Sequence, residues 1–179
     1  HRKKVVVRAL DKKRIHHEIE HIKKIYNSAW EKNWGFVPMT EREIDYMATS
    51  LIQIIDPNIV LFAEIGGEPI AFILALPDFN QALKHTNGRL FPLGLAKILW
   101  HARKINSVRI LAFGIKEAYR QQGIDALLYY EVFKSGVKRG YRRGELSWIL
   151  EDNLLMNRAL QNMGAKVYKR YRIFDYPLK

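Results

Sequence analysis

Residues 120–126, RQQGIDA, combine a basic side chain with a glycine-containing turn, and both suit phosphate binding. They follow an apolar run, VRILAFGI, that indicates a strand, and they open an apolar-patterned stretch that indicates a helix. The first amides of a helix have no intrahelical partner and lie at the positive end of its dipole, so they attract anions. Arg120 adds charge, Gly123 permits close approach, and Gln121 to Asp125 can present successive amides. By spacing alone an ordinary strand-to-helix turn is the better explanation, because the segment is neither a Walker loop nor G-x-G-x-x-G.

The composition describes a folded globular chain with an excess of positive charge. The 179 residues are 48% hydrophobic, which predicts one domain with a substantial core. The chain contains no Cys, which excludes disulfides, thiolate metal sites and a Cys nucleophile. No apolar run is long enough to cross a bilayer. The net charge of +12 is dispersed over the chain, so a solvated basic surface is favoured over nucleic-acid binding, which stays open.

The elements that must position residues 120–126 can be read along the chain. VVVRAL (5–10) indicates a strand, and a 3–4 spacing of apolar residues predicts a helix over about 11–32. Thr40 with Glu43 forms a capping box that starts a second helix. Residues 59–77 form two apolar runs around Gly-Gly, the pattern of a β-hairpin that ends at Pro77. Residues 78–106 form an insertion with a helix after Pro92.

Three further elements are expected after the helix that begins near residue 124. Alternation over 140–150 predicts a strand with Glu145 and Ser147 on one face. Residues 151–164 predict a short helix capped by Asp152 or Asn153, and 165–178 predict a final strand. The expected fold class is α/β (α+β): a mixed, mostly antiparallel central sheet flanked by helices, with a helical insertion between the third and fourth strands.

Two motifs in this order resemble a known family. KEAYRQQGIDALL is similar to the P-x-Y-R-G-x-G-I-G-x-A-L-L stretch of GNAT-type acyl-CoA N-acyltransferases, and EDNLLMNRALQNMGA is similar to their N-x-x-A-x-x-L-Y-E-x-x-G-F segment. The order of elements matches that fold, including a V-shaped opening between the fourth and fifth strands. NSAWEKNWGFVPMT, LPDFNQAL and GELSWILEDN look like the C-terminal half of longer bacterial GNAT-like proteins of unassigned substrate, which fits the absence of an initial Met.

The resemblance implies a site for acetyl-CoA or another acyl-CoA in the opening of the sheet. The CoA pyrophosphate would rest on the amides of the helix start, and the pantetheine arm would run beside the preceding strand. A backbone N–H near Gly114 would polarise the thioester carbonyl. The implied cofactor-binding residues are Phe113, Gly114, Ile115, Arg120, Gln121, Gln122, Gly123, Ile124, Asp125, Ala126 and Asn153. No metal ligand is expected.

Two positions depart from the family pattern. Asp125 stands where Gly or Ala is usual, and a carboxylate near a pyrophosphate is unfavourable unless it turns away or pairs with a cation. Leu160 stands where the family often has a Tyr that protonates the departing thiolate. The acid would then be water or a neighbouring tyrosine such as Tyr168, or the domain is a poor catalyst.

A general base is needed near the opening, because the attacking amine loses a proton. Glu145 and Glu151 are the candidates, at the middle and end of the fifth predicted strand. Asp152 fits a helix cap better than a base. Glu145 can equally be an ordinary strand residue held in a salt bridge.

The expected function is an acyl-CoA-dependent N-acyltransferase, most simply an N-acetyltransferase, acting on a small-molecule or peptide amine by direct attack. One alternative is a non-catalytic GNAT-like structural or binding domain of a tandem protein, and another is a relative of aminoacyl-tRNA-dependent transferases. Residues 1–179 are expected to form one cytoplasmic GNAT-like domain that follows a similar half in a longer chain. The insertion at 78–106 and the aromatic loop at 30–39 would shape the acceptor pocket.

Overall fold

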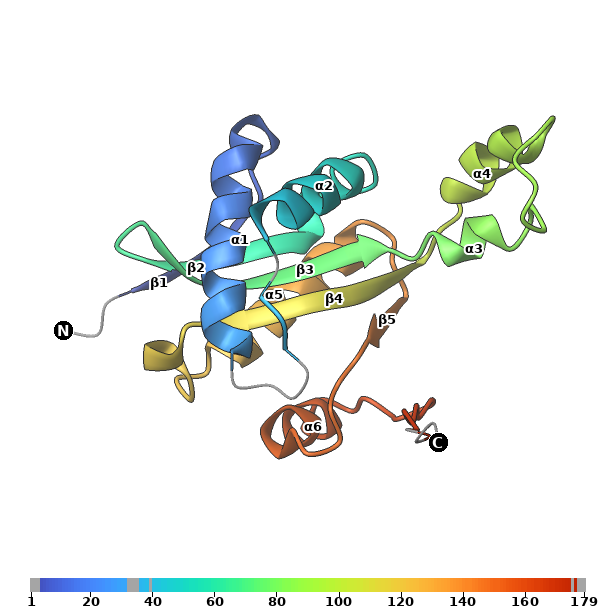
Figure 1. Cartoon of the computed structure of the whole chain (residues 1–179). Helices are drawn as coiled ribbons and strands as arrows, with labels where there is room; N and C mark the ends of the chain where they lie inside the picture. Colours follow the sequence, from blue (N-terminus) through green and yellow to red (C-terminus); the bar gives the residue numbers. More distant parts are fainter. Residues whose placement is uncertain (1–3, 32–35, 39, 175, 177–179) are drawn as a thin grey trace. The chain divides into compact units, whose positions relative to one another are not determined.

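The computed structural model describes residues 4–31, 36–38, 40–174 and 176 (Figure 1). The chain forms two compact units, residues 1–147 and 148–179, and each is described by itself. Of the aromatic loop at 30–39, residues 32–35 and 39 lie outside the described part, as do residues 175 and 177–179 of the predicted last strand.

The first unit is built on a five-stranded sheet in the order β1-β2-β3-β4-β5. Neighbouring strands are antiparallel except for β4 and β5, which are parallel. The mixed, mostly antiparallel sheet that the sequence predicts is therefore present. The strands are β1 Val5–Ala9, β2 Val60–Ile65, β3 Glu68–Pro77, β4 Ser107–Ile115 and β5 Arg143–Leu146.

The β2–β3 hairpin forms where the sequence predicts it. Gly66 and Gly67 both adopt positive φ angles, 62° and 83°, which side chains rarely tolerate and which a two-residue hairpin turn requires. β3 ends at Pro77, as expected, because proline cannot extend a ladder as a donor. Nearly every residue of β3 is buried, so this strand is covered on both faces.

Helices cover both faces of the sheet in this unit (Figure 1). Position 114 has no side chain, and a Cβ there would meet Ile25 and Ala29 of α1; the adjacent Phe113 stacks on Tyr129 of α5. Because neighbouring strand residues point to opposite faces, α1 and α5 lie on opposite sides of β4. The helices of this unit are α1 Ile15–Trp30, α2 Glu41–Leu51, α3 Asn80–Leu83, α4 Gly94–Ala102 and α5 Ile124–Lys138.

Local signals set the starts of the first two helices. Asp11 accepts a hydrogen bond from the Lys13 amide at 2.9 Å, and a 3₁₀ turn over Lys12–Arg14 leads into α1, so the regular helix begins later than residue 11. Thr40 caps α2 in the predicted capping box: Glu43 Oε2 accepts from the Thr40 amide at 2.9 Å, and the Glu43 amide donates to Thr40 Oγ1 at 3.3 Å. Two further 3₁₀ turns lie at Pro57–Ile59 and Glu117–Tyr119.

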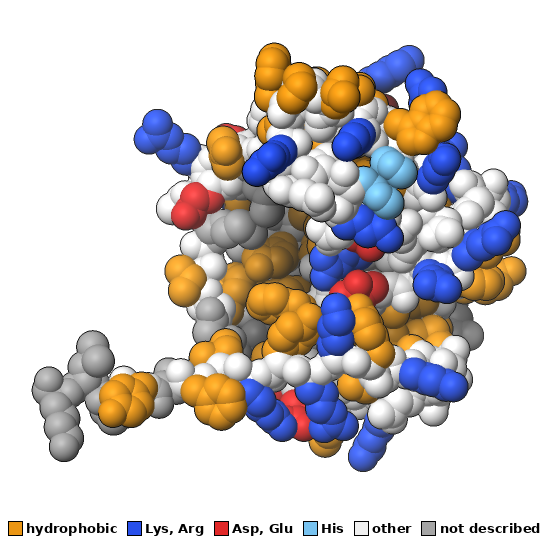
Figure 2. All heavy atoms as spheres, turned by 90° about the vertical axis from the view of Figure 1, so that its right-hand side faces the viewer, with side chains coloured by type: hydrophobic (Ala, Val, Ile, Leu, Met, Phe, Trp, Pro, Cys, Tyr) orange, Lys and Arg blue, Asp and Glu red, His pale blue; other side chains and the backbone are white. Residues whose placement is uncertain are grey.

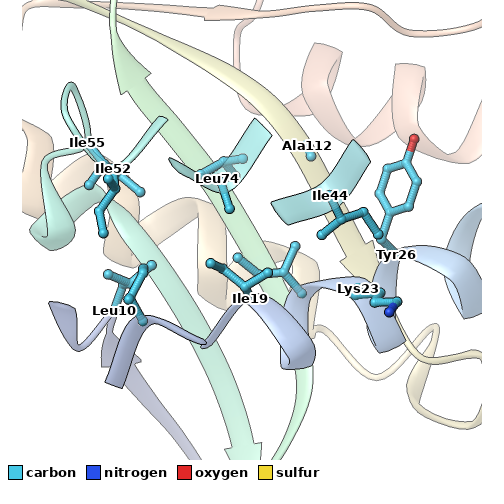
Figure 3. A pocket seen from close by; sticks show the side chains of 12 residues that line it. Leu10, Ile19, Lys23, Tyr26, Ile44, Ile52, Ile55, Leu74 and Ala112 are labelled. Carbon is cyan, nitrogen blue, oxygen red and sulfur yellow. The ribbon is translucent and has the colours of Figure 1, made fainter. Parts of the chain in front are cut away.

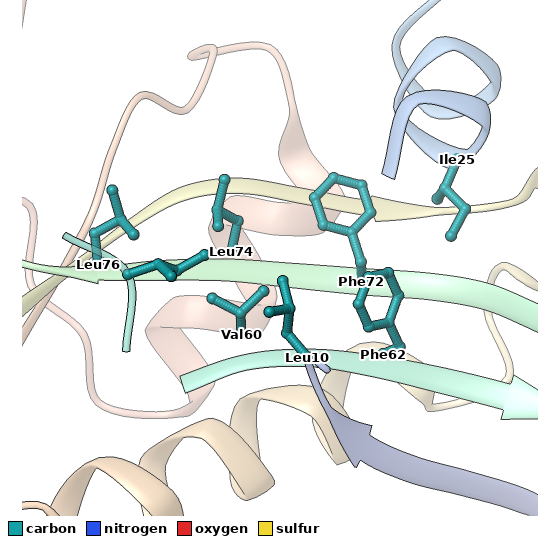
Figure 4. Close-up of a cluster of buried hydrophobic side chains, with 8 residues drawn as sticks. Leu10, Ile25, Val60, Phe62, Phe72, Leu74 and Leu76 are labelled. Carbon is teal, nitrogen blue, oxygen red and sulfur yellow. The ribbon is translucent and has the colours of Figure 1, made fainter. Parts of the chain in front are cut away.

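The core lies between α1 and the middle strands. Figure 4 shows Phe62 of β2 and Phe72 of β3 beside Ile25 of α1, and all three are at most 1% exposed. Leu74 and Leu76 continue the cluster along β3. This packing fixes α1 against β3 and β4, which places the C-terminal end of α1 beside the C-terminal end of β4.

Residues 78–106 form α3 and α4 between β3 and β4, and α4 follows Pro92 as the sequence predicts. The base of this segment is closed by the Asp78 amide, which donates to the Ser107 carbonyl at 2.9 Å, and by the Asn106 amide, which donates to Gln81 Oε1 at 3.3 Å. In Figure 1 the segment lies beyond the ends of β3 and β4.

The second unit contains α6, Leu154–Asn162, with Asn153 as its N-cap. The final strand predicted over 165–178 is wrong for its described residues, because residues 165–174 adopt no strand. Side-chain alternation is compatible with an extended chain, but a strand also needs a partner for its amides and carbonyls. The strand predicted over 140–150 is shorter as well: β5 covers 143–146 only, because its pairing with β4 stops at Ile110↔Leu146.

Candidate functional site

An opening separates β4 from β5 beyond their first few residues. Their parallel pairing runs from Ser107↔Arg143 to Ile110↔Leu146, whereas β4 continues to Ile115. The β3–β4 register also shifts by one residue between Leu74 and Ala75, which leaves Leu111 as an extra residue on β4. The second half of β4 therefore has an edge toward the opening that β5 does not cover. This is the opening between the fourth and fifth strands that the resemblance to the family implies.

The hydrogen-bond alternation of β3 and β4 decides which backbone groups face this edge. The Lys116 amide donates to the Ile70 carbonyl at 2.9 Å, and these two residues lie directly opposite each other. In an antiparallel pair every second position is bonded in this way, so Gly114 is bonded to Phe72 of β3. The N–H and C=O groups of Phe113 and of Ile115 then point to the opening. The N–H groups available to a ligand near Gly114 are therefore those of its two neighbours.

Two side chains already bind carbonyls on this edge. Trp30, the last residue of α1, donates its indole N–H to the Phe113 carbonyl at 3.2 Å. The Arg120 guanidinium donates to the Ile115 carbonyl at 3.5 Å and to the Ala29 carbonyl at 3.0 Å. The sequence predicts a cofactor-binding role for Arg120, and it places Trp30 only at the start of the aromatic loop 30–39 that is expected to shape the acceptor pocket. Trp30 falls on the apolar stripe of its helix, and nothing in that spacing indicates a backbone contact with residue 113.

Gly114 is a packing residue as well as part of the predicted site. A Cβ at this position would lie 3.0 Å from the Phe72 ring, 3.2 Å from Ile25 and 3.3 Å from Ala29. Glycine therefore allows α1 to approach β4 closely, and this approach brings Trp30 to the strand edge.

The turn from β4 to α5 exposes a series of backbone amides. Gln121 and Gly123 both adopt left-handed φ angles, 60° and 77°, and a Cβ added at Gly123 would have nothing within 4 Å. In the described part of the chain, no amide from residue 121 to residue 126 donates a backbone hydrogen bond outside the helix. The turn is thus sterically open, and its donors are those of a helix N-terminus. It fits an anionic ligand such as a pyrophosphate.

Asp125 lies in the first turn of α5, four residues before Tyr129. Burial raises the pKa of the Tyr129 hydroxyl well above its ordinary value, and the charge of Asp125 raises it further. The Asp125 carboxylate is therefore close enough to Tyr129 for its charge to affect that hydroxyl. A carboxylate in the first turn is itself favourable in the helix dipole, so Asp125 competes with an incoming anion for the same positive end.

Glu145 is held in a salt bridge across the β4–β5 pair. It lies opposite Arg109, whose Nη2 donates to Glu145 Oε1 at 3.1 Å and to Ser147 Oγ at 3.3 Å. The shared partner agrees with the predicted common face of Glu145 and Ser147. The geometry matches the structural interpretation of Glu145 as a paired strand residue, and its role as a base stays a prediction.

Glu151, in the second unit, is exposed and bound to two arginines. Its carboxylate accepts from Arg170 at 3.5 Å and makes a short contact with Arg172. The hydrogen bond and charge of Arg172 hold the pKa of Glu151 below its ordinary value, which makes it a weaker base than a free glutamate.

Asn153 and Tyr168 also belong to the second unit. Asn153 Oδ1 accepts from the Met156 amide at 3.2 Å and caps α6, which selects Asn153 over Asp152 as the cap. Tyr168 is 64% exposed, and the Lys169 ammonium lies 5.2 Å from its ring centroid. Because the two units are described separately, the predicted approach of these residues to the β4–β5 opening stays a prediction.

An apolar cavity of about 90 Å³ lies under α1 and α2, on the α1 face of β4 (Figure 3). Its walls include Ile19 and Tyr26 of α1, Ile44 of α2 and Ala112 of β4. The Tyr26 ring also stacks on Trp30, with ring centroids 4.9 Å apart. Aromatic surface therefore runs from the edge of β4 to the cavity.

Neither a cluster of metal-ligand side chains nor a membrane-spanning helix occurs among the described residues. Among them, no group of three or more His, Cys, Asp or Glu side chains could hold a metal ion. Within the same residues, no helix combines the length and the apolar character needed to cross a bilayer.

The sheet with a split between its parallel strands, followed by a helix with open N-terminal amides, matches one family of proteins. Residues 19–165 match the model of the "Acetyltransferase (GNAT) family", and the chain belongs to that family. Over 180 residues it is 38% identical to Protein YghO of Escherichia coli strain K12 and 37% identical to a bacterial ceramide synthase of Caulobacter vibrioides. These matches cover 97% of the chain but only 46% and 47% of the relatives, so the chain spans about half of their length.

Solved structures share the fold at low sequence identity. The aminoglycoside acetyltransferase AAC(6')-Iy, in complex with a bisubstrate analogue of CoA and acetylneamine, is similar with a TM-score of 0.62 and 15% identity, over 98% of this chain and 99% of that one. The ribosomal-protein-S18-alanine N-acetyltransferase of Escherichia coli is similar with a TM-score of 0.57 and 12% identity, over 90% and 77% of the two chains.

Proposed function

We propose that the protein is an acyl-CoA-dependent N-acyltransferase that moves an acyl group from a CoA thioester to an amine. The observation that carries the proposal is the uncovered edge of β4, which leads directly to the open amides at the start of α5. A ligand could therefore bind the edge of β4 with one part and the amides of α5 with the next. In acyl-CoA the pantetheine arm would lie along the strand edge, and the pyrophosphate would bind the amides.

The amides from residue 121 to residue 126 would hold the pyrophosphate, with Arg120 beside them. The N–H groups of Phe113 and Ile115 would receive the pantetheine carbonyls or the thioester oxygen, where a fixed donor stabilises developing negative charge. The carbonyls of the same two residues already accept from Trp30 and Arg120. Ligand amides that need these acceptors would have to displace the two side chains, whereas the N–H donors face the opening.

The thioester supplies an activated acyl group, so the protein needs no nucleophile of its own. The attacking amine must lose a proton, and Glu145 and Glu151 remain the proposed bases, with Tyr168 as the proposed acid for the departing thiolate. Both glutamates are bound to arginines, Glu145 to Arg109 and Glu151 to Arg170 and Arg172. A water molecule between the amine and one of these carboxylates would let either act without breaking its salt bridge.

The cavity under α1 and α2 supports transfer of an acyl group longer than acetyl. All its described lining residues are aliphatic except Lys23 and Tyr26, and a space with such a lining takes apolar ligands. The other face of β4 is closed by the Phe113–Tyr129 stack, with centroids 5.2 Å apart. An acyl chain leaving the opening would therefore pass Tyr26 toward the cavity on the α1 face.

The acceptor would be a primary amine, either on a small molecule or on a peptide. The solved relatives include proteins named for aminoglycosides and for the alanine of a ribosomal protein, and the Caulobacter relative is named for making a ceramide. A ceramide is a lipid amide, so its formation is N-acylation of an amine. Among these classes the apolar cavity favours an enzyme that handles long chains. We further propose that residues 1–179 act as one cytoplasmic domain after a similar half in a longer chain.

Thermal denaturation with CoA tests the cofactor assignment. A ligand that binds only the native state at one hundred times its Kd stabilises it by about 2.7 kcal/mol, so the melting temperature should rise. Gly123→Glu places a carboxylate among the open amides and should abolish the rise. Gly140→Glu is the matched control, because Gly140 also has a positive φ, 88°, and open space at its Cβ. An unchanged melting temperature at millimolar CoA, or an equal increase in Gly123→Glu, would contradict the cofactor assignment.

A non-catalytic CoA-binding domain is the second candidate. The arginine partners of Glu145 and Glu151 favour it, since both carboxylates already accept hydrogen bonds from guanidinium groups. Release of free CoA from acetyl-CoA and octanoyl-CoA, measured across a panel of amines, separates the two candidates. Binding of CoA without turnover of any amine would favour the non-catalytic domain.

A further inference from the structure

The segment 79–106, which follows Asp78 and leads from β3 to β4, carries only positive charge. It contains Lys84, Arg89, Lys97, Arg103 and Lys104, and no Asp or Glu. Basic side chains without interspersed acids attract anions and keep copies of the segment apart. This segment is therefore a cationic element within the first unit.

The same segment exposes large apolar side chains. Phe91 is 90% exposed, and the leucines at 93, 95 and 99 are 65%, 61% and 61% exposed. Trp100 is 58% exposed. In Figure 2 hydrophobic side chains gather over this end of the molecule, with Lys and Arg side chains around them. Apolar side chains grouped in this way on a folded protein indicate an interaction surface.

The apolar side chains are exposed although the segment itself is well held. α3 packs against α4, and the rings of His85 and His101 stack with centroids 3.7 Å apart. The base is closed by the hydrogen bond from the Asp78 amide to the Ser107 carbonyl and by the one from the Asn106 amide to the Gln81 side chain. On α4, Leu95 and Leu99 are four residues apart and so share one face of the helix. The contacts between α3 and α4 therefore hold the segment together without burying these leucines, which stay exposed to solvent.

We propose that the segment 79–106 binds the surface of a bilayer that contains anionic lipids. Leucine, phenylalanine and tryptophan side chains enter the boundary between headgroups and acyl chains, and lysine and arginine bind the phosphates above them. Lys104 lies 5.0 Å from the Trp100 ring centroid, which joins one residue of each kind. With nine residues α4 is about 14 Å long, so it lies in the interface and does not span it.

The chemistry of the surface selects a membrane over other partners. A nucleic acid would bind the basic side chains through its phosphates. It would leave Phe91 and the leucines exposed to water, because its backbone provides no apolar surface to bury them. A second copy of the same surface would cover the leucines but would bring like charges together without acidic partners. An anionic bilayer satisfies both kinds of side chain. The inference rests on exposure and charge, and it does not depend on the proposed CoA site.

Co-sedimentation with vesicles tests the proposal. The wild-type chain should pellet with vesicles of phosphatidylcholine containing 30% phosphatidylglycerol and much less with phosphatidylcholine alone, and salt should weaken the binding. Leu95→Asp with Leu99→Asp should reduce vesicle affinity at least tenfold. The matched control is Phe133→Asp with Val137→Asp, because these residues are also four apart and exposed on α5, at 69% and 55%. Lys97→Gln should cost about fivefold.

Each result decides the proposal when circular dichroism shows that both double variants are folded. Absence of wild-type binding to anionic vesicles at low salt would overturn it. Equal losses in the α4 and α5 variants would overturn it too, because the effect would not belong to the segment. Wild-type binding to tRNA but not to vesicles would show a nucleic-acid surface instead. A dimer that Leu95→Asp with Leu99→Asp breaks, again without vesicle binding, would show self-association.

Discussion

Replacement of Arg8 by Met should strongly destabilise the first unit. Arg8 on β1 donates from Nη1 to Glu18 Oε1 at 2.8 Å and from Nε to Glu64 Oε1 at 2.7 Å. The Glu18 side chain is 2% exposed, and its other carboxylate oxygen is buried without a hydrogen-bond partner. Methionine removes the guanidinium, whose central carbon also lies 4.7 Å from the Phe62 ring centroid, so Glu18 is left as an uncompensated buried charge.

The magnitude follows from the burial of Glu18. Removal of one partner of a buried ion pair costs about 3–5 kcal/mol, a large part of the roughly 5–15 kcal/mol that stabilises a domain. For a chain of this size the melting temperature should fall by about 6–20 °C. Since α1 carries both Glu18 and Trp30, the same change should loosen the contact between Trp30 and the edge of β4.

Urea denaturation followed by circular dichroism measures the loss. Arg8→Met with Glu18→Gln should recover much of the stability, because a neutral amide is less costly to bury than an unpaired carboxylate. A loss below about 1 kcal/mol, the value of an exposed pair, would refute the reasoning.

Three further predictions test the site and its surroundings. Ala48→Phe should fill the cavity and weaken octanoyl-CoA binding by about fourfold for each displaced methylene, with CoA binding itself unchanged and Ala96→Phe as the control. Gly114→Ala should cost about 1–3 kcal/mol in urea denaturation, because its Cβ would lie 3.0 Å from a core aromatic ring. Arg172→Gln should raise the pKa of Glu151 toward its ordinary value in a carboxylate titration by NMR, because the hydrogen bond that lowers it is lost. In the wild type this pair stabilises the fold at neutral pH, and its contribution is lost as the pH falls through the lowered pKa of Glu151.

These three have clear contrary outcomes. Unchanged octanoyl-CoA binding in Ala48→Phe would remove the cavity from the acyl path. A fully stable Gly114→Ala would mean that α1 can withdraw from β4 at little cost. An unchanged pKa of Glu151 in Arg172→Gln would mean that Arg170 alone holds the carboxylate.

The turn at residues 120–126 shows which features of the site a short stretch of sequence can predict. The turn alone indicates only a helix start with accessible amides, and the structure has the left-handed φ at Gly123 and the open amides that such a turn requires. The binding roles of Arg120 and Gly123 come from the resemblance to the family, which the turn by itself does not establish. The hydrogen bond of Trp30 to the Phe113 carbonyl was not predicted, because the two residues are 83 positions apart in the chain. The partner of Glu145 was anticipated only as a salt bridge, because the identity of Arg109 depends on the register between β4 and β5.

The sequence alone determined the helix starts and turns, because these depend on residues only a few positions apart. Thr40 and Glu43 set the start of α2, Gly66 and Gly67 set the hairpin turn, and Gly123 precedes α5, since capping and positive φ are local properties. Tertiary structure decided where β4 and β5 part and which carbonyls Trp30 and Arg120 occupy. It also decided that residues 165–174 form no strand, although their alternation suits one. A strand and its edge exist only with a partner, and the partner comes from a distant part of the chain.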